Sequence, residues 1–198
     1  MSQIMAILIL IVFAYVIGSV PSGYLLGKLA GVDVRSVGSG NIGATNVARA
    51  LGKGRGVVTL LADAAKGYLP VFLALRLEFS ATAIALIAIA AFLGHLYPLF
   101  LNFHGGKGVA TALGGLLALA PTATLVLIAV FAVAVLASRI VSLGAIAAAL
   151  AAPVVLWFFS QSAVIVAMGV FLGAMVILRH RGNIQRLLAG TEPRLGAH

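Results

Sequence analysis

The sequence predicts an all-α integral membrane protein, a helical bundle with about seven transmembrane helices, some of them short or broken. The chain has 198 residues, of which 63% are hydrophobic and only 9% are charged, whereas a soluble domain carries about 25% charged residues. Its apolar runs approach the ~20 residues that a helix needs to cross a ~30 Å hydrocarbon core. These runs do not alternate in polarity as barrel strands do, so helices are expected.

The apolar segments follow one another along the chain. They cover residues 3–29, 57–76, 80–101, 108–120, 122–138, 143–159 and 163–179. The first has no basic residues before it and exceeds the apolar core of a signal peptide, so it is expected to be a retained transmembrane helix. It carries Ser19, Gly23, Gly27 and Gly31 at four-residue spacing, which predicts the close approach of another helix.

The stretch from Gly108 to Ser138 is too long for one ordinary span and short for two, and Pro121 interrupts it. If it forms two short spans or a re-entrant pair, all of the 13 Lys and Arg residues except Arg76 fall on one side of the membrane. A single span would divide them almost equally, so the positive-inside rule favours the first arrangement. The N-terminus is then outside and the C-terminus is cytoplasmic. Whether the pair spans fully or re-enters stays open.

With this topology the polar segments 32–56, 102–107, 139–142 and 180–198 gather on the cytoplasmic face. In the first of them, Gly38–Asn46 reads GSGNIGATN and Arg49 follows. Glycines let successive backbone N–H groups point into one concavity, and Ser, Thr and Asn add side-chain donors. The pattern is typical of a phosphate site, and its plain alternative is a flexible polar linker.

A second glycine-rich segment, residues 94–111, reads GHLYPLFLNFHGGKGVAT. Lys107 lies just before an expected helix, where it could hold a phosphate as a point charge, or could merely anchor the topology. The segment lacks the Ser or Thr that follows the Lys of a P-loop. His95 is either a general base or a packed histidine.

The remaining polar positions are less specific. Residues 179–192 read RHRGNIQRLLAGTE, and a basic tail of this kind can simply contact anionic lipid. Ser142 could contact a ligand or cap the helix after it. Asp63 and Lys66, three residues apart, are expected to pair with each other or with another helix, because isolated charges inside a membrane are costly.

Three segments resemble the signature regions of the bacterial acyl-phosphate:glycerol-3-phosphate acyltransferases. They are Gly38–Asn46 with Arg49, residues 94–111 and residues 179–192. The likeness covers nearly the whole chain, including its length and the order of the motifs. It implies that residues 1–198 form a single transmembrane acyltransferase domain of the bacterial cytoplasmic (inner) membrane, with its active site on the cytoplasmic side. It also implies transfer of an acyl group from acyl phosphate to the 1-hydroxyl of sn-glycerol 3-phosphate, which gives 1-acylglycerol 3-phosphate (lysophosphatidic acid) and inorganic phosphate.

The resemblance assigns roles to particular residues. Catalytic roles fall to Ser39, His180 and Asn183. The acyl phosphate would be held by Gly38, Ser39, Gly40, Asn41, Gly43, Ala44, Thr45 and Asn46, and glycerol 3-phosphate by Arg49, Lys107, Ser142, His180 and Asn183. Substrate assistance, in which phosphate itself takes the hydroxyl proton, is the mechanism that the resemblance suggests, and His180 or His95 as base is the competing hypothesis.

The composition argues against other classes of protein. There is no cysteine, and the four acidic residues are scattered, so neither a thioester intermediate nor a metal site is expected. CDP-alcohol phosphatidyltransferases need an aspartate cluster that is missing here. A transporter would place polar groups near the bilayer midplane, and a scaffold would not need three phosphate-suited loops. No cofactor, nucleic acid or obligate protein partner is expected beyond the two substrates and membrane lipid.

Overall fold

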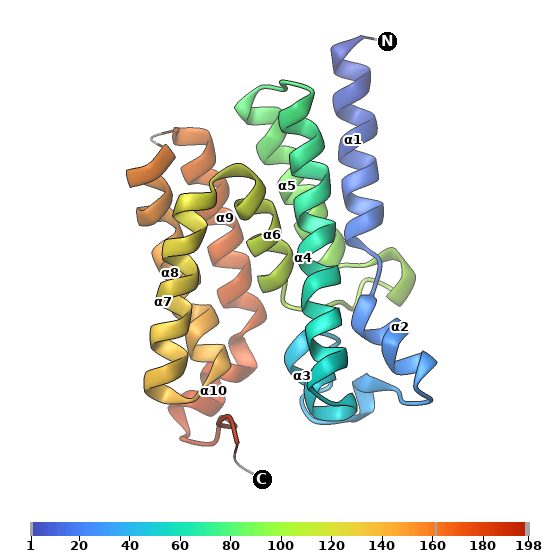
Figure 1. The fold of residues 1–198 in the computed structure, drawn as a ribbon, viewed down its shortest axis with the longest axis vertical. Coiled ribbons are helices and arrows are strands. Elements are labelled where there is room, and N and C mark those ends of the chain that lie inside the picture. The colour runs from blue at the N-terminus through green and yellow to red at the C-terminus, as the bar shows by residue number, and fades with distance from the viewer. Residues whose placement is uncertain (1, 161, 197–198) are drawn as a thin grey trace. The chain divides into compact units, whose positions relative to one another are not determined.

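A computed structural model of the chain describes residues 2–160 and 162–196, and every regular element among them is a helix (Figure 1). The all-helical prediction is therefore confirmed. The chain divides into two compact units, unit 1 (Met1–Leu119) and unit 2 (Ala120–His198). Each unit is described by itself.

Unit 1 contains the first six α-helices and two short 3-10 helices. They are α1 (Gln3–Gly18), α2 (Ser22–Leu29), η1 (Val34–Ser36), α3 (Ala44–Leu51), α4 (Lys53–Arg76), α5 (Ala81–Leu96), η2 (Leu99–Leu101) and α6 (Val109–Leu119). Hydroxyl side chains cap two of the apolar helices, because Ser2 and Ser80 accept hydrogen bonds from backbone N–H groups of α1 and α5. Predicted loops 32–56 and 180–198 each contain a helix that the apolar pattern does not reveal.

The first predicted span is interrupted between α1 and α2. Pro21 has no N–H to donate and its ring obstructs a continuing helix, so regular α1 ends at Gly18. The carbonyl of Val20 accepts a hydrogen bond from Lys66 Nζ on α4, at 2.9 Å. A side chain from another helix thus satisfies a backbone group at the break, as an interruption inside a membrane requires.

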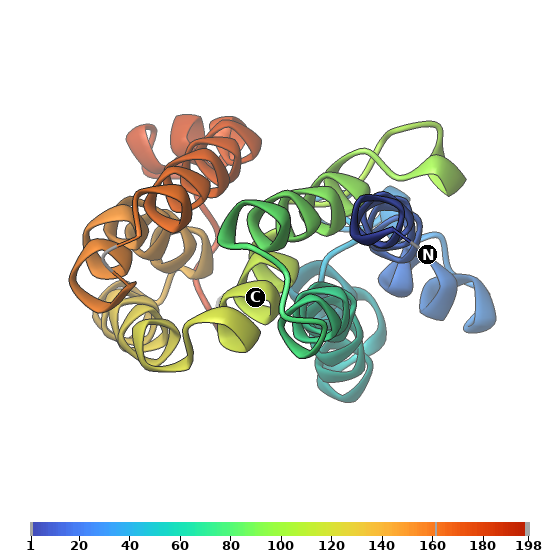
Figure 2. The ribbon, with the colours of Figure 1, turned by 90° about the horizontal axis from the view of Figure 1, so that it is seen from above.

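Glycines let the helices of unit 1 approach backbone to backbone. A Cβ on Gly18 would strike the Ala91 carbonyl of α5, and one on Gly94 would strike the Tyr15 carbonyl of α1. On α6, Gly114 lies equally close to the Ala64 carbonyl of α4. Figure 2 shows α1 beside α5 and α4 beside α6.

The predicted small-residue stripe lies against both other helices and the polar segment that follows α2. Gly23 and Gly27 lie against the carbonyls of Ile42 and Val32, which belong to the polar segment that follows α2. Gly31 has φ +72° and open space around it. A Cβ on Gly23 would also meet the Thr59 side chain of α4, and one on Gly94 of α5 would meet the Ser19 nitrogen. The expected close approach of another helix is therefore found at Ser19 and Gly23, and the chain that turns back after α2 covers the rest of the stripe.

Unit 2 contains α7 (Pro121–Ser138), α8 (Val141–Ser160), α9 (Ala163–Arg179) and α10 (Arg181–Leu188). Its helices pack in sequence order: Gly144 of α8 lies against Phe131 of α7, and Gly173 of α9 lies against the Ala149 backbone of α8. Pro121 is the first residue of α7, the position where its missing N–H costs nothing. Residues 109–119 and 121–138 are thus two separate helices rather than one.

Five helices among the described residues are long and apolar enough to cross a membrane, with α1 and α2 taken together as one. A sixth candidate arises if α9 and α10, which are bent by 60°, are taken as one span. Helix α6 has 11 residues, or about 17 Å of length, which is short of a full crossing. This agrees with the prediction of a bundle in which some helices are short or broken.

Gly114→Ala should lower the free energy of unfolding by about 1–3 kcal/mol, because the new Cβ has to displace the α4 backbone. Gly54→Ala is the matched control. It lies in the first turn of α4 with nothing within 4 Å of a new Cβ, so it should leave the stability unchanged or slightly raised. The midpoint of thermal unfolding in detergent compares the two, and equal midpoints would contradict the close α4–α6 contact.

Candidate functional site

The first glycine-rich segment is folded around the side chain of Asn46, which is 2% exposed. Asn46 Oδ1 accepts a hydrogen bond from the Ser39 N–H at 2.9 Å. Its Nδ2 donates to the carbonyls of Val34 and Val37, at 2.8 and 3.0 Å. The predicted loop is therefore an ordered turn rather than a flexible linker. Both amide protons of Asn46 are used within it, which gives this residue a positioning role.

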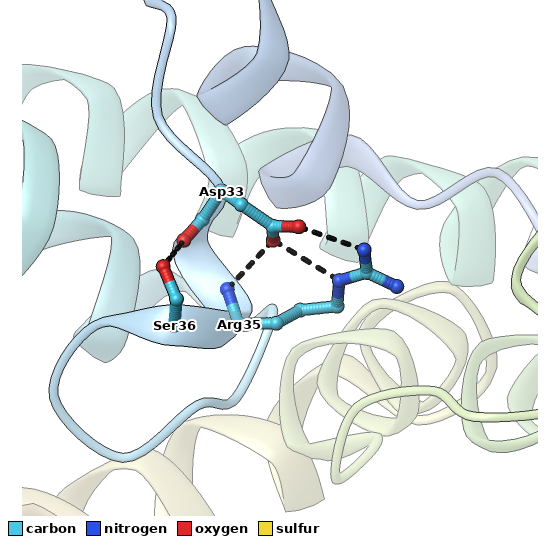
Figure 3. A network of polar contacts seen from close by, with 3 residues as sticks. All are labelled: Asp33, Arg35 and Ser36. Carbon is cyan, nitrogen blue, oxygen red and sulfur yellow. Dashed lines mark hydrogen bonds and ion pairs between the residues drawn. The ribbon is translucent and has the colours of Figure 1, made fainter.

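An ion pair fixes the start of the same segment (Figure 3). Asp33 Oδ1 accepts from Arg35 Nε at 3.0 Å, and Oδ2 accepts from Arg35 Nη2 at 2.7 Å. The Arg35 side chain and backbone hydrogen bonds lower the pKa of the exposed Asp33 to about 2. The guanidinium also lies over the Tyr24 ring of α2, 4.6 Å from its centroid. Arg35 thus stays charged and fixed beside the loop.

The beginning of α3 leaves backbone donors for an anion. Asn46 and Val47 donate their N–H groups to the Gly43 carbonyl, and Asn41 Oδ1 accepts the Gly43 N–H. Ala44 and Thr45 are the first two residues of the helix. Their backbone N–H groups have no hydrogen-bond partner within the described segments. Such amides, at the positive end of a helix dipole, are typical of anion sites. Ser39, Thr45 and Arg49 are all exposed beside them.

The second glycine-rich segment doubles back onto the end of α5. The N–H groups of Gly105 and Gly106 donate to the carbonyls of Leu96 and His95, each at 3.1 Å. A Cβ on Gly106 would strike Nε2 of His95, and one on Gly108, at φ +81°, would strike the Phe92 ring. Only glycine fits these positions. The segment therefore holds Lys107 just before the first turn of α6.

Behind this segment lies a buried group of ionisable side chains. Lys66 Nζ is 2.9 Å from Asp63 Oδ1, and His95 Nδ1 is 3.7 Å from the same oxygen. All three side chains are at most 5% exposed. The expected pairing of Asp63 with Lys66 is confirmed, and His95 joins the pair.

In unit 2, Glu192 brings together two of the predicted site residues. Its Oε1 accepts from the Ser142 hydroxyl at 2.7 Å and from Asn183 Nδ2 at 2.5 Å, while Oε2 pairs with Arg186 Nε at 2.7 Å. Burial raises the pKa of Glu192, but these hydrogen bonds outweigh it and hold the pKa below its ordinary value. The carboxylate thus ties the start of α8 to α10.

His180 occupies the bend between α9 and α10 and is 3% exposed. Its Nδ1 lies 2.8 Å from the Val176 carbonyl. A carbonyl can only accept, so Nδ1 carries the proton of the neutral ring and Nε2 is the basic nitrogen. The bend therefore fixes both the orientation and the tautomer of this imidazole.

The predicted site residues divide between the units. Unit 1 holds Gly38, Ser39, Gly40, Asn41, Gly43, Ala44, Thr45, Asn46, Arg49 and Lys107, and unit 2 holds Ser142, His180 and Asn183. Sequence reasoning did not single out Glu192 as the centre of the second group. Its one signal is that it is a rare acid inside a basic segment. No group of three or more His, Cys, Asp or Glu suited to a metal occurs in the part of the chain that the structure describes.

Comparisons with known proteins decide the family. The family model for glycerol-3-phosphate acyltransferase matches residues 8–190. The chain belongs to the glycerol-3-phosphate acyltransferase family. A protein of that name from Geobacter metallireducens is 52% identical over 190 residues, which cover 96% of this chain and 98% of the relative. One from Trichlorobacter lovleyi is 50% identical over 184 residues, covering 93% and 95%.

Two solved structures of this family have the same fold. The crystal structure of PlsY, an integral membrane glycerol 3-phosphate acyltransferase, in its glycerol 3-phosphate form has a TM-score of 0.94 at 44% identity, over 96% of each chain. The lysophosphatidic acid form has a TM-score of 0.91 at 42% identity, again over 96% of each chain. These similarities establish that the chain is an integral membrane acyltransferase.

Glu192→Gln should lower the free energy of unfolding by about 2 kcal/mol at pH 7, because hydrogen bonds to a charged group become bonds to a neutral one. Since the folded pKa of Glu192 lies below its ordinary value of 4.5, its stabilising effect is complete above that value and is lost as the pH falls further. Glu78→Gln, at an exposed turn, is the control. Thermal unfolding of both variants between about pH 2 and pH 7 tests this, and a difference that persists unchanged at the lowest pH would contradict it.

Proposed function

We propose that this enzyme transfers an acyl group from acyl phosphate to the 1-hydroxyl of sn-glycerol 3-phosphate, giving 1-acylglycerol 3-phosphate and inorganic phosphate as the first acylation of phospholipid synthesis. The ordered Gly38–Asn46 turn carries the proposal, because its helix-terminal amides and exposed hydroxyls suit the phosphate of the donor. The relatives' solved forms with glycerol 3-phosphate and lysophosphatidic acid support the acceptor and the product.

The proposed donor fits the chemistry of the chain. An acyl phosphate is already activated, so no enzyme nucleophile is required and the absence of cysteine is no obstacle. The acceptor hydroxyl oxygen attacks the carbonyl carbon, and the bond between that carbon and the phosphate oxygen breaks. The departing phosphate takes the hydroxyl proton in the same reaction. The enzyme then has to position two anions and stabilise charge.

The residues divide these tasks. Gly38, Ser39, Gly40, Asn41, Gly43, Ala44 and Thr45 form the donor phosphate site, with Asn46 holding its shape and the Ser39 hydroxyl donating to the reacting group. Arg49, Lys107, Ser142, His180 and Asn183 contact glycerol 3-phosphate, with His180 and Asn183 orienting the hydroxyl for attack. All but one of the basic residues lie on one side in the topology proposed here, which makes that side the cytoplasmic face of the bacterial inner membrane.

The decisive experiment measures phosphate release from purified protein in detergent with palmitoyl phosphate, with and without glycerol 3-phosphate. Acceptor-dependent release, with lysophosphatidic acid formed in equal amount, is the expected result. If folded protein uses palmitoyl-CoA and leaves palmitoyl phosphate intact, the proposed donor is wrong although the family assignment stands.

Lys107→Ala should raise the KM for glycerol 3-phosphate roughly tenfold to a hundredfold with a smaller change in kcat, because it removes one charge-assisted contact to phosphate. Lys107→Arg should recover part of the loss. Lys53→Ala, which removes an exposed charge at the start of α4, is the matched control. An unchanged KM in the Lys107 variant would remove this residue from the acceptor site.

His180→Ala distinguishes substrate assistance from a histidine base. With substrate assistance the loss is mainly in acceptor affinity, and the pH profile of kcat keeps its shape. A large fall in kcat together with loss of an ionisation from the profile would establish His180 as the base instead.

A further inference from the structure

The buried group of Asp63, Lys66 and His95 has no task in the reaction proposed above. Asp63 is 2% exposed, and Lys66 and His95 are each 4% exposed. Ionised groups in such surroundings are expensive unless they are paired, and residues of this kind inside a membrane bundle usually serve function. The three side chains come from α4 and α5, which lie within unit 1.

The group connects the two irregular parts of unit 1. At one end Lys66 Nζ, which also pairs with Asp63, donates to the Val20 carbonyl at the break between α1 and α2. At the other end the His95 ring lies directly against Gly106, where a Cβ would strike its Nε2. The next residue is Lys107. An unbroken series of contacts thus runs from the helix break to the acceptor-binding lysine.

The same contacts argue against His95 as a base. One ring nitrogen, Nδ1, faces the Asp63 carboxylate at 3.7 Å. The other, Nε2, abuts the Gly106 backbone. A general base has to reach the proton that it removes, directly or through one water. The buried ring is instead placed to support the loop that passes over it.

We propose that Asp63, Lys66 and His95 are positioning residues that fix the 105–107 loop against α5 and so place Lys107 at the phosphate of glycerol 3-phosphate. This inference rests on the proposed function for its effect on the acceptor. The Asp63 carboxylate orients the imidazole, and Lys66 keeps that carboxylate in place. The imidazole then supports Gly106, whose N–H donates to the His95 carbonyl.

The plain alternative is that Asp63 only neutralises the buried ammonium of Lys66. A pair of variants separates the two ideas. Asp63→Asn removes the charge that orients His95, and the double variant Asp63→Asn/Lys66→Met also removes the ammonium that would be left unpaired. If Asp63 serves Lys66 alone, the double variant regains wild-type exchange at the Gly105 and Gly106 amides, whatever the loss of the Lys66 bond to Val20 does at the break between α1 and α2. If Asp63 serves His95, the amides of Gly105 and Gly106 still exchange faster than in the wild type.

The first measurement is hydrogen–deuterium exchange of the full-length protein in detergent, which does not depend on catalysis. The amides of Gly105 and Gly106, protected in the wild type by their bonds to the α5 carbonyls, should exchange about tenfold faster in Asp63→Asn, in the double variant and in His95→Leu. Protection within α5 should stay unchanged. His104→Asn is the control, because the exposed His104 imidazole belongs to the same segment and lies 2.6 Å from the nearby Asn102 carbonyl.

The second measurement is steady-state kinetics of Asp63→Asn and His95→Leu, because Lys66→Met also removes the bond to the Val20 carbonyl. The KM for glycerol 3-phosphate should rise about tenfold with kcat within about twofold, as expected when a binding contact is displaced and the chemical step is not. The variant that combines Asp63→Asn with His95→Leu should have a KM for glycerol 3-phosphate no higher than that of either single variant, since both residues act through one series of contacts.

Each outcome bears on one idea. Unchanged exchange at Gly105 and Gly106 in His95→Leu, or full recovery in the double variant, would overturn the positioning network. Faster exchange with an unchanged KM would mean that the three residues only stabilise the 105–107 loop. It would overturn the proposal that they position Lys107 for glycerol 3-phosphate. A wild-type enzyme that does not acylate glycerol 3-phosphate would instead overturn the proposed function, while the exchange data would still decide the structural part.

Discussion

The hydrogen bond from Lys66 to the Val20 carbonyl is the constraint on which unit 1 depends. Within a bilayer no water satisfies a backbone carbonyl, so a helix can be interrupted only where protein supplies a donor. Lys66 supplies it, at 2.9 Å, and Asp63 balances the ammonium. Beyond the break, the Gly38–Asn46 segment turns back against α2, where the Ile42 carbonyl lies against Gly23. The segment that we propose for the donor phosphate follows this interruption in the chain and packs against α2.

The three polar segments share one principle of construction. Each contains or contacts one polar side chain that is largely buried. Asn46 hydrogen-bonds the backbone of the first segment, the His95 ring packs against Gly106 of the second, and Glu192 hydrogen-bonds the Ser142 and Asn183 side chains in the third. Because a hydrogen bond in surroundings of low dielectric is strong and an unmade one is costly, such a side chain rigidifies the backbone around it.

Rigid loops suit the proposed chemistry. An acyl phosphate brings its own leaving group, so the enzyme gains most by holding two anions in a fixed relation and by excluding alternative geometries. Fixed amides and cations also stabilise developing charge without reorganising during the reaction. His180, with its tautomer set by the Val176 carbonyl, is an example of a side chain oriented before the substrate arrives.

The sequence by itself determined the helical membrane architecture, the positions of most helices and the three polar segments, because apolar length and glycine-rich composition are local properties. It also marked Lys107, Ser142 and His180 as candidates. Only the tertiary structure assigned Asn46 to the support of its loop, joined Ser142 to Asn183 through Glu192, and placed His95 beneath Gly106. These contacts join residues distant in the chain or buried in a turn, and no local pattern specifies such pairings. The apolar pattern did not predict helices α3 and α10, because they are short and polar.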